Sequence, residues 1–118
     1  MFLQEAAHDS FGTCPYVTIQ RVISGKWSIL ILHQLEEGTL RFGQLQRKLP
    51  QLTQATLTKQ LRALEEYGMI RRVVYPEVPP HVEYSLTELG EEFRLVLDEL
   101  RRFGEKYIAH MEGISVAE

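Results

Sequence analysis

A chain of 118 residues, 44% of them hydrophobic, can bury one modest core, which predicts a single domain. The formal net charge of −3 excludes a protein that coats nucleic acid through overall positive charge, so any contact with nucleic acid requires a local basic surface. No apolar run approaches the roughly 18 residues of a membrane span, and no cationic and apolar leader opens the chain, which predicts a cytoplasmic protein without membrane contact. The single cysteine excludes an internal disulfide, and the four dispersed histidines suggest no metal site, so we expect neither metal nor cofactor.

The first segment, residues 1–13, has no sustained hydrophobic period and is predicted to be a loose N-terminal arm. The remaining residues, 14–118, are predicted to form the domain. Its first helix begins at Pro15, which suits the first helical position, and ends at Gly25, so that Cys14 is the N-cap. The thiol of Cys14 is either an inert small hydrophobe or a regulatory group, since the positive end of a helix dipole favours the thiolate form.

A strongly apolar run over residues 26–37 predicts the central helix of the core, and Gly38 ends it. Trp27 and His33 lie in this run and raise the question of a ligand site. An aromatic residue on such a helix usually packs in the core, and a lone histidine there is usually a hydrogen-bonded structural residue. We therefore interpret both residues as structural.

Two consecutive segments predict a helix-turn-helix. Residues 40–49 place apolar side chains on one helical face, and a connection through Pro50 leads to a second helix that Thr53 caps and Gly68 ends. One side of this second helix is a narrow apolar seam, and the other carries amide, hydroxyl and basic groups that can reach base edges and phosphates in the DNA major groove. The DNA-contacting residues predicted on this helix are Gln54, Ala55, Thr56, Thr58, Lys59 and Arg62.

Taken alone, that helix is better explained as an ordinary solvated amphipathic helix, and it is the context that favours DNA binding. A β-branched run over residues 69–75 and an alternating pattern over residues 82–86 predict a β-hairpin, the wing of a winged helix. Residues 39–72 contain seven Lys or Arg and two Glu, a net of +5, so with −3 overall the other residues carry −8. The further DNA contacts predicted here are Arg41, Arg71, Arg72 and, at the wing tip, His81.

The C-terminal part, about residues 87–110, is predicted to be one long helix with Thr87 as its N-cap. Apolar residues recur along it at spacings of four and three over some twenty residues, or about 30 Å. This stripe is longer than a small domain needs, so either a second copy of the chain or the chain's own core covers it, and the second copy is favoured. The predicted dimer-interface residues are Tyr16, Phe93, Val96, Leu100, Phe103 and Tyr107.

Together these segments resemble the HxlR family. The resemblance rests on GKW at 25–27, LRFGQL at 40–45, LTKQLRALE at 57–65 and YPEVPPHVEYSLT at 75–87. It implies a mainly α fold with a small β-hairpin, a winged helix-turn-helix of MarR-like architecture that dimerises through its terminal helices. It also implies a homodimeric transcriptional regulator, with repression favoured over activation, that binds inverted repeats of double-stranded DNA near promoters. Cys14 matches a cysteine that senses oxidants or electrophiles in some members and not in others.

Two features depart from the family pattern. His81 occupies the wing tip where a cation such as Arg is usual, and the recognition helix starts with Thr53, Gln54 and Ala55 where a more basic pair is common.

Two other classes of function are alternatives to DNA binding. One is a winged-helix module that binds protein through the same surface. The other is an enzyme, which is disfavoured because no nucleophile with a base, glycine-rich phosphate loop or carboxylate pair occurs at a useful spacing.

Overall fold

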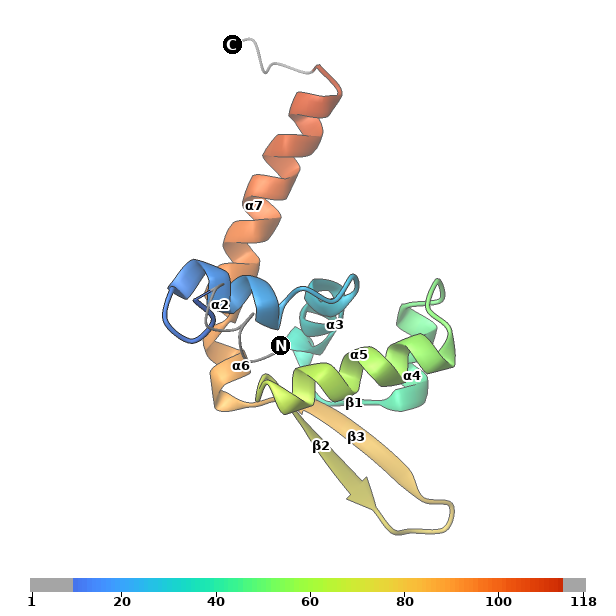
Figure 1. Cartoon of the computed structure of the whole chain (residues 1–118). Helices are drawn as coiled ribbons and strands as arrows, with labels where there is room; N and C mark the ends of the chain where they lie inside the picture. Colours follow the sequence, from blue (N-terminus) through green and yellow to red (C-terminus); the bar gives the residue numbers. More distant parts are fainter. Residues whose placement is uncertain (1–9, 114–118) are drawn as a thin grey trace.

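The computed structural model describes residues 10–113 of the chain (Figure 1). The predicted N-terminal arm therefore lies largely outside the described residues. In chain order the elements are α2 (Pro15–Val22), α3 (Ser28–Gln34), the 3-10 turn η1 (Leu35–Glu37), β1 (Leu40–Arg41), α4 (Phe42–Lys48), α5 (Gln54–Glu66), β2 (Ile70–Tyr75), β3 (His81–Leu86), α6 (Glu88–Glu92) and α7 (Arg94–Met111). This order, mainly helical with a helix-turn-helix followed by a hairpin, confirms the predicted winged helix-turn-helix.

The first helix, α2, begins where the sequence predicts and ends earlier. Pro15 lies at its start and Cys14 is the N-cap, with extended backbone angles (φ −92°, ψ 121°). The predicted end at Gly25 is wrong, because the hydroxyl of Ser24 donates to the carbonyl oxygen of Arg21 at 2.8 Å and ends the helix in a turn. No residue of α2 is buried, so the helix rests on the surface of the domain.

The central helix is shorter than the sequence predicts at both ends, because residues 26 and 27 belong to an irregular connection and the last turn, Leu35–Glu37, is a 3-10 turn. The helix α3 begins at Ser28, and Trp27 precedes it, with the ammonium of Lys26 5.2 Å from the centre of the Trp27 ring system. Trp27 packs against the core, which confirms its structural role. His33 is hydrogen-bonded as expected, with Nδ1 2.7 Å from the Glu36 carboxylate, but its side chain is exposed rather than enclosed in the core.

The predicted hairpin forms two strands of a three-stranded antiparallel sheet, in the order β1-β3-β2. The register pairs Ile70 with Leu86 at the base and continues without a bulge to the tip. The sequence does not predict β1, because a strand of two residues is too short to show a period of its own. Arg41 is extended there (φ −81°, ψ 161°), pairs with β3, and donates its backbone N–H to Oε1 of Gln44 at 2.8 Å.

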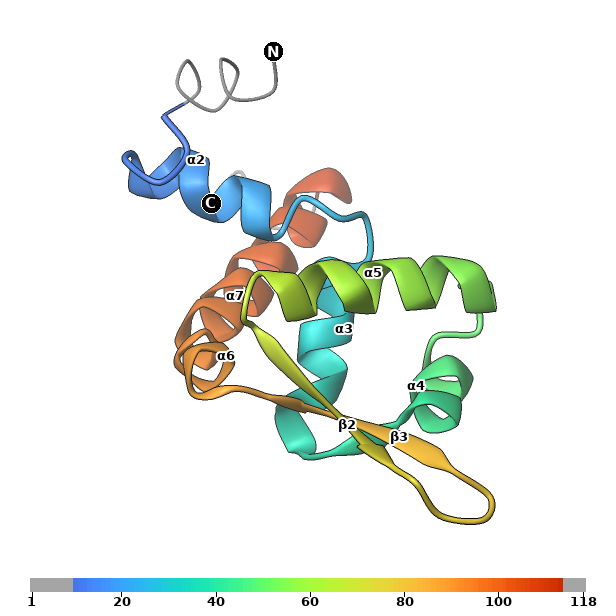
Figure 2. The same ribbon diagram turned by 60° about the horizontal axis from the view of Figure 1, so that its bottom comes forward.

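The core lies between α3, α5, the sheet and the base of α7, and Figure 2 shows α3 crossing behind α5, with the hairpin continuing from the end of α5. The predicted apolar seam of α5 is buried and consists of Leu57, Leu61 and Leu64. Thr53 caps this helix, because its hydroxyl accepts a hydrogen bond from the N–H of Thr56 at 3.1 Å. Gly68 follows the helix with a φ of 80° that glycine adopts without strain. The predicted boundaries of the second helix of the helix-turn-helix are confirmed.

The C-terminal part is two helices rather than the single one that the sequence predicts. Thr87 caps the first, α6, as expected, because its hydroxyl accepts from the N–H of Gly90 at 3.0 Å. The helix is then interrupted at Phe93, and α7 begins at Arg94. Phe93 is only 6% exposed and belongs to the core of its own chain. Its predicted place in a dimer interface is therefore corrected, since the core already encloses its ring.

Beyond Leu97, which is still buried, α7 leaves the body of the domain and points away from the wing (Figures 1 and 2). The radius of gyration is 16.9 Å, whereas a compact domain of about 100 residues has a value near 13 Å. The excess reflects the projection of the helix and the wing. Within the described residues, the outer part of α7 therefore exposes apolar side chains to solvent.

Replacing Gly90 by Ala should lower the free energy of unfolding by about 1–3 kcal/mol. Gly90 is buried, and a Cβ at this position would overlap the backbone carbonyl oxygen of Met69, which cannot swing aside as a side chain can. Urea unfolding measures the change. The matched control is Gly104→Ala in α7, where a Cβ meets no atom within 4 Å. This substitution should stabilise the helix by up to about 1 kcal/mol, because alanine has a higher helix propensity than glycine. Equal effects at the two positions would contradict the close packing of α6 on Met69.

Candidate nucleic-acid interface

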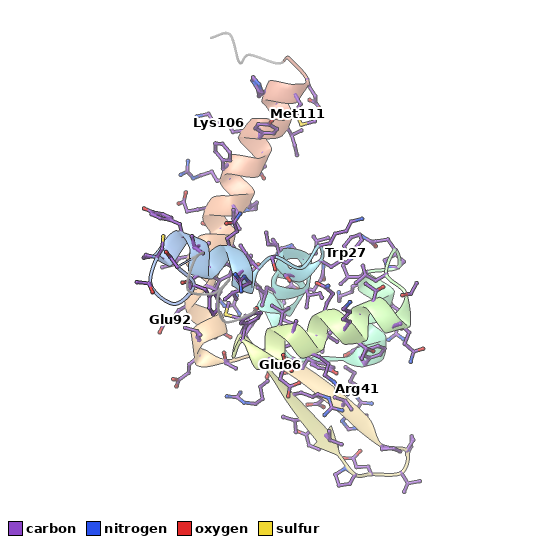
Figure 3. The ribbon with its side chains drawn as sticks, in the orientation of Figure 1. Trp27, Arg41, Glu66, Glu92, Lys106 and Met111 are labelled. Atoms are coloured by element: carbon purple, nitrogen blue, oxygen red, sulfur yellow. The ribbon has the colours of Figure 1, made fainter. Side chains whose placement is uncertain are left out.

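The outward side of α5 carries the side chains that the sequence predicts to contact DNA. Exposed along one line, at intervals of four and three residues, are Ala55, Lys59 and Arg62. Gln54 is exposed at the start of the helix, and Thr56 and Thr58 are half-buried at the flanks. The two carboxylates of the helix come only at its end, where Figure 3 shows Glu66. The earlier turns of α5 therefore present only neutral and cationic groups to solvent.

The turn from α4 to α5 is held in place at both ends. Leu49 and Leu52 are buried, and the side-chain amide of Gln46 donates to the carbonyl oxygen of Leu52 at 3.3 Å. At the start of α5 the Thr53 hydroxyl donates to the Thr56 hydroxyl at 2.9 Å. Because the Thr56 oxygen accepts this bond, its hydroxyl proton is still available for a further hydrogen bond. The position of α5 relative to α4 is thus fixed by side-chain contacts.

A hollow of about 480 Å³ separates α4 from the wing. Arg41 and Arg47 line one side of it, and Pro80 and His81 line the other. Figure 3 shows Arg41 below α5 and next to the hairpin. The sequence prediction includes Arg41 but not Arg47, although the Arg-Lys pair in the last turn of α4, inside the basic stretch, is a pattern that could have indicated it. The hollow places two guanidinium groups where α4 and the wing approach each other.

The predicted wing contact, His81, is held by its own hairpin. Its Nδ1 lies 3.3 Å from the Glu77 carboxylate and its Nε2 lies 3.1 Å from the Glu83 carboxylate. Its ring stacks on Tyr75, with the ring centres 4.8 Å apart. Both nitrogens therefore face acceptors within the wing, and the first role of His81 is to brace the hairpin. Its contact with a phosphate stays a prediction.

Arg71 and Arg72 are adjacent in sequence and lie on opposite faces of the sheet. Arg71 is exposed and pairs with Ser85 on β3. Arg72 pairs with the buried Tyr84 and is half-buried. The two guanidinium groups therefore leave the strand in opposite directions, and a single phosphate on one side of the wing cannot bind both in the same way.

Positive charge is left unpaired on the helix-turn-helix and the wing. Within residues 10–113, no carboxylate forms an ion pair with any of the seven basic residues of the 39–72 stretch. These residues are Arg41, Arg47, Lys48, Lys59, Arg62, Arg71 and Arg72. In contrast, Arg94, Arg101 and Arg102 of α7 are each bonded to a carboxylate of α6 or α7. The basic surface is therefore uncompensated where the DNA contacts are predicted, whereas the three arginines of α7 are compensated.

One of the paired arginines, Arg94, also fixes the base of α7. Its guanidinium donates to the carboxylate of Glu91 and to the backbone carbonyl oxygen of Glu36 in η1. The hydrogen bond from Arg94 lowers the pKa of Glu91 below its ordinary value, and the same bond raises the pKa of Arg94. These contacts tie the start of α7 to the end of the central helix.

A second unpartnered surface lies on α7 and α2. The predicted interface residues that remain exposed are Tyr16 on α2 and, on α7, Val96, Leu100, Phe103 and Tyr107. A hollow of about 820 Å³ runs along this part of α7. Figure 3 shows Lys106 and Met111 on opposite sides of the outer helix, and Met111 extends the apolar side. An apolar stripe with a charged opposite side is the pattern of a helix that packs against another helix.

Cys14 is half-buried at the start of α2. The Oγ of Thr18 accepts from the backbone N–H of Gly12 at 2.7 Å and so ties the preceding turn to the first turns of the helix.

The described residues contain no group of His, Cys, Asp and Glu side chains placed to hold a metal ion. They also contain no helix long and apolar enough to cross a membrane.

Comparison with known proteins assigns most of the chain to one family. The family model described as HxlR-like helix-turn-helix matches residues 22–112. The chain is similar to an HTH-type transcriptional regulator of Methanothermobacter thermautotrophicus, with 50% identity over 77% of this chain and 70% of the relative. It is also similar to the HTH-type transcriptional regulator YdeP of Bacillus subtilis, with 42% identity over 92% of this chain and 85% of the relative.

Solved structures with the same arrangement are also regulators. The redox regulator HypR in its reduced form has a TM-score of 0.80 and 38% identity, covering 85% of this chain and 99% of that chain. A MarR-family regulator of Porphyromonas gingivalis has a TM-score of 0.74 and 40% identity, covering 78% and 90%. The reduced form of the regulator YodB of B. subtilis has a TM-score of 0.71 and 30% identity, covering 80% and 94%.

Proposed function

The chain belongs to the HxlR-like helix-turn-helix family of transcriptional regulators, and we propose that it is a homodimeric repressor that binds an inverted repeat in double-stranded DNA. Members of this family bind DNA and are not enzymes. The observation that carries the proposal is the unpaired basic surface of the helix-turn-helix and wing, on a chain whose net charge is −3. Cations left without carboxylate partners can neutralise phosphates and displace the counterions condensed on DNA, and the release of these counterions drives association.

In the proposed complex the first turns of α5 enter the major groove. The amide of Gln54 suits adenine, and Lys59 or Arg62 suits the acceptors of guanine. Ala55 lies on the same exposed line, and its small side chain allows close approach to a base edge or to a thymine methyl group. Thr56 and Thr58 add hydroxyl groups at the flanks. Base recognition is therefore assigned to the exposed line of α5 and its two ends.

Phosphate contacts are assigned to the cations that surround this helix. Arg41 and Arg47 line the hollow beside the wing. With α5 in the major groove, the phosphate backbone that borders the groove beside α4 would pass both guanidinium groups. Arg71 and Arg72 extend the positive surface along β2, one on each face of the sheet. Contacts of this kind position a protein on the duplex without sequence preference. His81 joins them to the extent that its two carboxylate partners leave it available.

A winged-helix module that binds protein through the same surface is the alternative function. The two functions differ in their response to salt. The logarithm of DNA affinity falls linearly with the logarithm of salt concentration, by about 0.9 per neutralised phosphate, whereas a protein interface of mixed polarity has no such requirement. Fluorescence anisotropy of a labelled duplex selected from random DNA, measured across a salt series, separates them. Absence of salt-dependent binding by the wild-type protein would favour the protein-binding module.

The substitutions Arg62→Ala and Arg72→Ala should have different effects on DNA binding. Loss of Arg62, on the groove side of α5, should cost about 1–3 kcal/mol on the selected duplex and relax preference at one base pair. Loss of Arg72, on the wing, should weaken selected and scrambled duplexes nearly alike and reduce the salt slope by about 1. The same anisotropy titration measures both. If both substitutions affected both duplexes equally, the assignment of α5 to base recognition would be wrong.

Dimerisation is proposed because the two unpartnered surfaces have different requirements. The basic surface is stable in water. In contrast, covering the apolar stripe of α7 and the exposed Tyr16 on α2 lowers the free energy, because it removes apolar surface from water. A second copy with two-fold symmetry covers the stripe with the same stripe. It also presents two copies of α5, which an inverted repeat matches when they lie about 34 Å, or one turn of DNA, apart. A dimer bound over such a repeat near a promoter blocks access to it, which is the basis for proposing repression.

Replacing Leu100 by Glu should convert the dimer into a monomer and abolish tight binding of the inverted repeat. The substitution places a charge within the apolar stripe, where burial against a second copy leaves it without water. Sedimentation velocity measures the change in mass. The matched control is Leu95→Glu on the opposite side of α7, where the side chain is 78% exposed. A monomeric wild type that still bound an inverted repeat, or dissociation by the control alone, would contradict the proposed interface.

We further propose that Cys14 makes the repressor responsive to oxidants or electrophiles. The similarity to HypR, a redox regulator by name, supports this proposal, as does the diamide-treated form of YodB among the similar structures. Cys14 is half-buried at the start of α2, beside Tyr16 of the proposed interface. It is the only cysteine of the chain, so oxidation would join its sulfur to a thiol of the partner subunit or to a small thiol, or an electrophile would form an adduct. Each product changes the surface at the start of α2.

Diamide should lower the affinity of the wild-type protein for the inverted repeat and leave the Cys14→Ser variant unaffected. The reason is that the serine hydroxyl replaces the thiol in nearly the same space but does not form a disulfide. Anisotropy titrations before and after treatment measure the change, and a reductant should restore wild-type binding. Equal affinity of the treated and untreated wild type, or loss of affinity in both proteins, would contradict a role for this thiol.

A further inference from the structure

The recognition helix has a polar junction with the connection between α2 and α3, on a side that does not face DNA. Gln60 follows Lys59 in α5 and so lies about 100° around the helix from it. Its side chain is half-buried. The hydroxyl of Ser28, the first residue of α3, lies 3.5 Å from Oε1 of Gln60. Ser28 is 2% exposed and is the buried polar residue of the described core.

The third member of the junction is Gly25, in the connection itself. A Cβ at this position would overlap Oε1 of Gln60 and would lie 2.5 Å from the hydroxyl oxygen of Ser28. The amide of Gln60 therefore occupies the space that any side chain at position 25 would fill. Gly25 also accepts from the N–H of Ser28 at 3.0 Å, which closes the turn around the amide. The absence of a side chain at residue 25, rather than backbone freedom, is what the junction requires.

This junction adds direction to an interface that is otherwise apolar. The other contacts of α5 with the core are made by its leucine seam, and hydrophobic contact is non-directional. A side-chain amide held between a turn and a hydroxyl opposes both rotation and sliding of the helix. Because Lys59 adjoins Gln60 and Arg62 lies two residues on, rotation of α5 about its axis would move both cations relative to a base edge.

We propose that Gln60 is a positioning residue, which fixes the rotation of α5 against the α2–α3 connection and thereby sets discrimination between specific and non-specific DNA. The inference rests on the proposed DNA-binding function. The same junction connects α5 to the helix that carries Cys14 and Tyr16, so displacement of α2 reaches the recognition helix through this turn. Gln60 itself makes no contact with DNA in this arrangement.

Two single variants break the junction from opposite sides. Gln60→Ala removes the amide from α5, and Gly25→Ala displaces it from the turn without changing any residue of α5. The clash in Gly25→Ala falls on side-chain atoms and not on backbone, so it is relieved when the amide of Gln60 moves away and the hydroxyl of Ser28 rotates about χ1. Each variant should bind the selected duplex on the order of tenfold more weakly, and a scrambled duplex within about twofold of wild type. The double variant should be no weaker than the weaker single, because both remove one contact.

The matched control is Ser24→Thr, which changes an exposed residue of the same connection, keeps the hydroxyl that bonds to Arg21 and leaves the amide of Gln60 in place. If either single variant bound the selected duplex as wild type does, or if affinities for selected and scrambled duplexes fell together, the proposal would be overturned. Failure of the wild type itself to discriminate would instead refute the proposed function. In that case amide hydrogen exchange tests the junction without DNA. Exchange in α5 should be faster in Gln60→Ala and Gly25→Ala than in the control, and unchanged exchange would refute the positioning role.

Discussion

Burial of the leucine seam of α5 is the constraint on which the rest of the molecule depends. The three leucines of the seam are at most 1% exposed, and full burial of each contributes about 1.5–3 kcal/mol. With 3.6 residues per turn, burying this seam also decides which side chains face outward. The exposed line of Ala55, Lys59 and Arg62 is thus a consequence of core packing. A sequence that kept the leucines and changed the line would keep the fold and change what it binds.

The distribution of charge follows a second constraint, set by function rather than packing. Cations that stay unpaired repel one another, and a carboxylate neighbour would remove this repulsion. On α7 such neighbours are present, as in the contacts of Arg101 with Asp98 and Glu105. On the helix-turn-helix and wing no carboxylate within residues 10–113 pairs with the basic residues. The chain therefore accepts a less favourable charge distribution in its free state on the surface where phosphates are proposed to bind.

Features that depend on local chemistry were predictable from the sequence, and features that depend on tertiary contact were not. The Thr53 cap, the turn at Gly68 and the hairpin follow from residue preferences and periodicity, and each is confirmed. The strand β1 exists only because β3 lies beside it, and the break at Phe93 occurs where the helix enters the core. The braced His81 and the opposed faces of Arg71 and Arg72 likewise required the register of the sheet. DNA contact by individual residues remains a prediction, which the fold makes geometrically possible.

In the proposed dimer the interface would be continuous with the core, and this continuity bears on regulation. Leu97 is buried in the core, and Leu100, one turn further along the same side of α7, is partly exposed and would enter the interface. Arg94 ties the start of the helix to the end of the central helix through the carbonyl of Glu36. A shift of the partner subunit against α7 therefore cannot be absorbed by a loop, because closely packed side chains transmit displacement. Its effect would reach α5 through the leucine core and, from α2, through the junction of Gln60 with Gly25.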